Sequence, residues 1–153
     1  FYACALHPNA GSPYALAGAQ DNGTQQFNTT GIGATNRFTG GDGAFCFIDQ
    51  TDPLIQVSSY VYNSYWLSTD GGISVSSRIQ NDQTTGKFIN PTDYDNNQDA
   101  LYSSHTTTTI NRITDLSTSY SVGSFSVTGM NSMASHLHVS PYTTTSTTLF
   151  IGC

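Results

Sequence analysis

The sequence of 153 residues contains no glutamate and few charged residues of any kind. Charged side chains make up 9% of the chain, and all ten acidic residues are aspartates. Any mechanism that needs a glutamate is therefore excluded. The formal net charge is −6, and the four cations are scattered: Arg37, Arg78, Lys87 and Arg112. Because no basic track is present to neutralise phosphates, nucleic acid is not an expected partner.

The sequence also lacks a long apolar run, an initiating Met and a signal peptide. Membrane insertion is therefore not expected, since a span needs about 20 apolar residues. The start at Phe1 indicates a processed or excerpted piece of a protein. Three cysteines without CxxC spacing predict neither a zinc site nor a full disulfide framework. Cys4, Cys46 and Cys153 are expected to be buried thiols, with one disulfide as the alternative.

Threonine and serine dominate what is present. Together they supply 41 residues, a composition that suits strands and turns better than helices. Asn22 and Asn28 begin N-x-Thr sequons and would be glycosylated if the source is eukaryotic. We therefore expect an all-β protein that is extracellular or exposed on the cell surface, without a cofactor.

Four stretches of the chain share one pattern, in which an alternating apolar strand, a polar turn and a second apolar strand follow one another. They are residues 1–20, 44–62, 87–105 and 134–153. If Pro8, Gln50, Pro91 and Pro141 are equivalent, the steps are 42, 41 and 50 residues. Such a period is typical of a four-stranded β-propeller blade.

The repeat predicts a β-propeller segment of about three to three-and-a-half four-stranded blades. The whole chain, 1–153, is then one segment, with approximate units 1–43, 44–86, 87–133 and a partial unit 134–153. Propellers close with typically 4–8 blades, so we expect missing blades or further copies of the chain as partners. A single closed domain is the less favoured alternative because the last unit would lack partner strands.

One motif carries a family resemblance. Residues 68–75, Ser-Thr-Asp-Gly-Gly-Ile-Ser-Val, fit the pattern S-x-D-x-G-x-x-apolar. Together with Ala17–Thr24 and Gly40–Asp49, this order of phrases resembles the Asp-box (BNR-repeat) propellers of secreted bacterial proteins, which are similar to sortilin/VPS10-type and xyloglucanase-type propellers. The resemblance implies that Ser68, Asp70 and Gly72 build a structural turn away from the usual ligand face.

The polar residues near the other turns are the candidate binding site. Because strands alternate in direction, the turns between second and third strands share one face with the connections between units. Carboxylates, amides and aromatic rings on rigidly held loops suit a sugar or a peptide, although the same residues also occur in ordinary turns. The candidates are Asp21, Asn22, Asp42, Tyr62, Asn63, Trp66 and His105.

Catalysis and metal binding are the weaker expectations. Glycoside hydrolysis needs two carboxylates about 5–9.5 Å apart, and Asp21 and Asp42 are the pair that topology could bring together. His136 and His138 lie two apart on a strand and point to one face, as a metal pair could, but no third ligand follows in sequence. An enzyme is thus less expected than a binding protein.

These observations favour an extracellular, non-catalytic binding or scaffold module that recognises a glycan or a protein. Two alternatives remain open. One is a glycoside hydrolase-like propeller that acts on a polysaccharide, and the other is a self-assembling structural subunit of a filament or surface layer. Propeller folds host many unrelated activities, so the architecture limits function only loosely.

Overall fold

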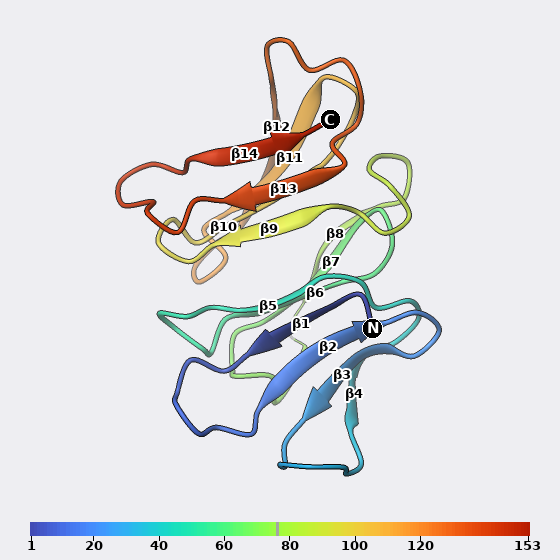
Figure 1. The fold of residues 1–153 in the computed structure, drawn as a ribbon, viewed down its shortest axis with the longest axis vertical. Helices are drawn as coiled ribbons and strands as arrows, with labels where there is room; N and C mark the ends of the chain where they lie inside the picture. The colour runs from blue at the N-terminus through green and yellow to red at the C-terminus, as the bar shows by residue number, and fades with distance from the viewer. Residues whose placement is uncertain (76) are drawn as a thin grey trace.

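The computed structural model describes residues 1–75 and 77–153, and within them all regular structure is β-strand (Figure 1). The strands of the first half are β1 (Ala3–Leu6), β2 (Ala15–Ala19), β3 (Gly23–Phe27), β4 (Asn36–Thr39), β5 (Cys46–Ile48), β6 (Gln56–Ser59) and β7 (Asn63–Ser68). Those of the second half are β8 (Ser77–Asp82), β9 (Thr92–Asp95), β10 (Ala100–Ser104), β11 (Thr109–Thr114), β12 (Ser121–Ser126), β13 (His136–Val139) and β14 (Leu149–Gly152).

The strands pair in chain order into three four-stranded antiparallel sheets and one hairpin. The first sheet is β1-β2-β3-β4, the second β5-β6-β7-β8 and the third β9-β10-β11-β12, while β13 and β14 form the hairpin. Each four-stranded sheet is thus one propeller blade, and the hairpin is half of one. The sheets do not close into a ring. The prediction of an all-β propeller segment of about three and a half blades is confirmed.

The sheets stack face to face, with their first strands along one side of the molecule. In Figure 1 the strands β1, β5, β9 and β13 succeed one another from bottom to top, and contacts join β1 to β5 and β9 to β13. Residues of these four strands line a groove on this side. It corresponds to the inner side of a propeller.

Strand alternation explains the apolar layers between sheets. Val57 and Leu67 pair across the second sheet, and both face Leu101 and Ile113 of the third sheet in one buried cluster. Smaller clusters fill the other two junctions, between the first and second sheets and between the third sheet and the hairpin. The second sheet thus buries both of its faces, and its strands carry apolar residues on both sides.

The repeat is more regular than the sequence suggested, because one of its predicted anchors was wrong. Pro8, Gln50 and Pro141 follow the first strand of their sheets, but Pro91 precedes β9. Proline cannot donate to a strand ladder, and it is common just before or at the first residue of a strand. The equivalent residue is Asn96, whose Oδ1 accepts a 2.7 Å hydrogen bond from the Gln50 amide. The steps become 42, 46 and 45 residues.

Candidate binding face

One face of the molecule carries the β2–β3, β6–β7 and β10–β11 turns and the connections between consecutive sheets; we call it the loop face. Backbone hydrogen bonds tie each turn to a connection. Gly43 donates to the Ala19 carbonyl over 2.9 Å, Tyr62 to the Phe88 carbonyl over 3.1 Å, and Gly86 to the His105 carbonyl over 2.8 Å. The loop face is therefore held by the sheets beneath it.

The structure brings Asp21 and Asp42 together on the loop face. Asp21 lies in the β2–β3 turn in a left-handed conformation with φ of 63°. Its backbone N–H donates to Asp42 Oδ1 over 2.8 Å, and Asp21 is exposed whereas Asp42 is half-buried. Asn22 is exposed beside them and donates to the Gln20 carbonyl over 3.1 Å. Asp42 thus fixes the turn while remaining partly accessible to solvent.

Tyr62 and Phe88 occupy the corresponding places in the next unit. Tyr62 also has a left-handed φ, of 56°, and its ring meets the Phe88 ring edge to face at 5.9 Å. Phe88 is 45% exposed. Sequence reasoning missed Phe88, although its spacing from Asp42 matches the 46-residue step between the second and third units. A carboxylate pair and an aromatic pair therefore stand at equivalent positions of consecutive units.

Asn63 lies near these residues in sequence but inside the protein. It is 0% exposed and joins the second sheet to the third. Its Nδ2 donates to the Ser104 carbonyl over 3.0 Å, and its Oδ1 accepts from Asn90 and Ser103 over 2.8 and 2.7 Å. Because these protein partners occupy the amide, Asn63 has no free group for a ligand.

The Trp66 ring meets the Tyr60 ring edge to face at 6.1 Å, and Tyr60 lies against Gly41, next to Asp42. Trp66 pairs with Ser58 on the side of the second sheet that faces the first, since the Ser58 hydroxyl contacts Thr39 over 3.1 Å. Arg78 covers its ring, with Cζ 4.6 Å from the centroid. His105 is half-buried in the β10–β11 turn, where its Nδ1 lies 2.7 Å from the Thr109 hydroxyl.

The Ser68–Asp70–Gly72 turn lies between β7 and β8, on the opposite face. Ser68 Oγ donates to Asp70 Oδ1 over 2.8 Å and accepts from the Gly72 amide over 3.0 Å. Hydrogen bonds from the Ser74 side chain and backbone, and then from Ser68, lower the pKa of Asp70 to about 2. The geometry is that of a self-supporting turn.

Glycine is required in this turn, as expected. Gly71 and Gly72 have φ of 73° and 82°, a region that other residues rarely enter. A Cβ on Gly72 would also clash with the Tyr14 hydroxyl and the Gln26 amide, and the Gly72 carbonyl accepts from Gln26 over 2.6 Å. The turn thereby docks onto the first sheet.

Two buried aspartates, which the sequence did not single out, join neighbouring sheets. Asp49 Oδ2 accepts from the Tyr94 hydroxyl over 2.7 Å, and Asp95 Oδ2 accepts from the Thr147 hydroxyl over 2.6 Å. Burial, and then the bond to Asp49, raise the pKa of Tyr94. The two carboxylates stand 46 residues apart at the ends of β5 and β9, a signal that the corrected repeat would have supplied.

His136 and His138 are exposed on β13, with their rings stacked at 6.5 Å. Folding supplies a carboxylate that the sequence did not place: His138 Nδ1 lies 3.2 Å from Asp93 Oδ2 of the third sheet. Within residues 1–75 and 77–153, no three such groups come together to hold a metal ion.

The three cysteines are free thiols, and two of them are not buried. Cys46 is buried at the junction of the first and second sheets, and burial raises its pKa to about 12. Cys4 and Cys153 are exposed, so the expectation of buried thiols was wrong for both. The asparagines of the two sequons, Asn22 and Asn28, are exposed.

No protein-family model and no curated protein matches this chain. In the described part of the chain, no helix is long and apolar enough to cross a membrane.

Proposed function

We propose that this chain is a non-catalytic binding and scaffold module that recognises a glycan through its loop face. The proposal rests on two pairs of residues at equivalent places of consecutive units. Asp21 contacts Asp42 in the first unit, and Tyr62 contacts Phe88 in the second. Carboxylates accept hydrogen bonds from sugar hydroxyls, and an aromatic ring offers an apolar surface to the ring of a sugar.

Rigidity supports this proposal. The turns that carry Asp21 and Tyr62 are tied by backbone hydrogen bonds to the connections that carry Asp42 and Phe88. Little conformational entropy is therefore lost when a ligand orders these residues. Binding residues are commonly found on loops that a rigid scaffold positions. The resemblance to Asp-box propellers agrees with an extracellular or cell-surface location, which is part of the proposal.

A glycan array with the intact chain tests it, followed by titration of the best ligand. Asp42→Ala removes both the charge and the support of the Asp21 turn, and we expect at least a tenfold loss of affinity. Asp42→Asn keeps a side-chain oxygen for the Asp21 amide, so it isolates the contribution of charge. Phe88→Ala should also weaken binding.

Asp115→Asn is the matched control, because Asp115 is exposed in the β11–β12 turn on the opposite face. Unchanged affinity in Asp42→Ala and Phe88→Ala, with the fold intact, would refute the proposed site. Binding of protein ligands alone would replace the glycan with a protein partner. Hydrolysis of a polysaccharide that disappears in Asp42→Asn would show that the module is catalytic.

A further inference from the structure

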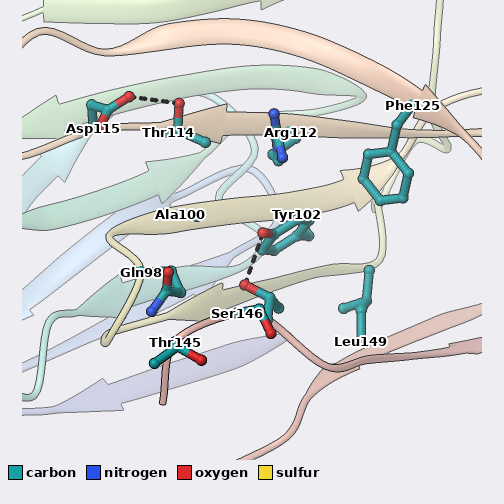
Figure 2. Close-up of a pocket in the computed structure, with 11 residues that line it drawn as sticks. Gln98, Ala100, Tyr102, Arg112, Thr114, Asp115, Phe125, Thr145, Ser146 and Leu149 are labelled. Atoms are coloured by element: carbon teal, nitrogen blue, oxygen red, sulfur yellow. Dashed lines mark hydrogen bonds between the residues drawn. The ribbon is translucent and has the colours of Figure 1, made fainter. Parts of the chain in front are cut away.

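The third sheet presents a groove where the fourth unit has only its β13–β14 hairpin. The groove has a volume of about 580 Å³ and lies between strands β10–β12 and the segment 145–149. Tyr102, Arg112, Phe125 and Leu149 line it, as Figure 2 shows. Tyr102 closes its inner end with a 2.9 Å hydrogen bond from its hydroxyl to Thr147.

The groove continues an established interface. Tyr102 and Ile110 of the third sheet are already buried against Leu137 and Val139 of the hairpin. Beyond this cluster the same face is open: Phe125 is 37% exposed, Arg112 is exposed, and every residue of β12 is exposed.

The repeat itself identifies what covers such a face. At the junction before, the outer part of the second sheet, including Tyr65, Leu67 and Ile79, is buried by the third sheet. Part of that cover comes from Ile113 of β11 and Leu116 of the turn that follows, which are 0% and 1% exposed. The equivalent cover over Arg112 and Phe125 would be a third and a fourth strand added after β14.

The edge of β14 is suited to receive them. Ser140 donates to the Thr148 carbonyl over 2.8 Å, which sets the alternation of the hairpin ladder. By that alternation, Phe150 and Gly152 turn their backbone groups toward β13, whereas Leu149 and Ile151 turn theirs to the open edge. An open edge of this kind pairs readily with an added strand.

We propose that the β14 edge and the groove together bind a two-stranded antiparallel β-hairpin supplied from outside residues 1–153. Its first strand pairs with Leu149 and Ile151. Alternate aliphatic side chains of that strand, equivalent to Ile113, pack on Tyr102 and Phe125, and a carboxylate or amide reaches Arg112, which forms no ion pair within the described residues. Within the described residues no third and fourth strands are left over for this place, because the third and fourth strands of all three sheets are paired in their own sheets.

The test appends residues 105–128 of this chain, its own β10–β11 turn with β11 and β12, directly after Cys153. The β10–β11 turn then serves as the connection at the end of β14. Hydrogen exchange measured by NMR should show at least tenfold slower exchange at the Leu149 and Ile151 amides than in the unextended chain, and the urea midpoint should rise.

Three variants make the result specific. An extension with the same residues in scrambled order should give no protection. Leu149→Asp in the host should abolish the effect, whereas Phe27→Asp, on the open face of the first sheet, should preserve it. A folded extended chain whose Leu149 and Ile151 amides exchange freely would overturn the proposal. Protection of these amides in the unextended chain that grows with concentration would overturn it too, and would assign the edge to a second copy.

Discussion

At the junction between the second and third sheets, the second sheet is covered out to its fourth strand, β8. At the junction between the third sheet and the β13–β14 hairpin, the third sheet is covered by two strands only. At the first, Tyr65, Leu67 and Ile79 are nearly or fully buried. At the second, Phe125 of β12 remains 37% exposed. The same repeated sheet therefore gains its outer core only where the next unit supplies third and fourth strands.

The largest expected effect is on the packing of the covered junction. Leu101 is fully buried there, and Leu101→Ala should lower the free energy of unfolding by about 2–5 kcal/mol. Val122→Ala on exposed β12 should change it by no more than about 0.5 kcal/mol. Urea denaturation of both variants checks this difference. Equal losses would mean that the outer strands of the third sheet are covered after all.

Two matched hydroxyl deletions come next. The Tyr65 hydroxyl is buried between Asn63 and Thr92, at 3.2 and 3.1 Å, so Tyr65→Phe removes two buried hydrogen bonds and should cost about 1–3 kcal/mol. The Tyr102 hydroxyl meets Thr147, which water can reach, and Tyr102→Phe should cost less than about 1 kcal/mol. Thermal unfolding of the pair measures the contrast, and a reversed order would contradict it.

A smaller effect is expected on the stability of the protein at acid pH. The pKa of Asp70 is about 2 in the folded protein against an ordinary 3.8, so its stabilising contribution is present above pH 3.8 and is lost as the pH falls toward 2. Asp70→Asn should therefore flatten the loss of Tm between pH 4 and pH 2, and Ser74→Ala should flatten it in part. The same slope in all three proteins would show that this turn does not depend on the Asp70 charge.

The smallest expected effect is on stability at alkaline pH, and it concerns the covered junction of the first and second sheets. Burial raises the pKa of Cys46 to about 12 from an ordinary 9, so the stability it contributes is full below pH 9 and declines between pH 9 and pH 12. Thiol labelling at neutral pH should modify Cys4 and Cys153 quickly and Cys46 only on unfolding. Rapid labelling at all three sites would mean that this junction is open as well.

Local patterns predicted the strands, their order and the left-handed glycines of the Asp70 turn, because alternation and turn chemistry act over a few residues. They did not predict the environment of Asn63, since a polar residue beside a turn reads the same whether it faces solvent or a neighbouring sheet. Asp49 and Asp95 were missed for a related reason: their partners Tyr94 and Thr147 lie 45 and 52 residues away.

The candidate site divides in the same way. Topology alone placed Asp21 and Asp42 on one face, because antiparallel strands fix which turns share an end of the stack. Phe88 was overlooked because its connection carries no turn motif. Trp66 stays a predicted binding residue, and its ring lies under Arg78. Contacts between units, and not the units themselves, decide which of these side chains a ligand can reach.

Hydrogen exchange across the whole unextended chain, at a concentration where it is monomeric, tests the central comparison most directly. We expect slow exchange in β6 and β10, whose residues are buried. We expect fast exchange at Leu149 and Ile151 of β14 and at the unpaired edge of β12. Equal protection of β10 and of the outward amides of β14 would contradict the claim that the edge of the fourth unit is open.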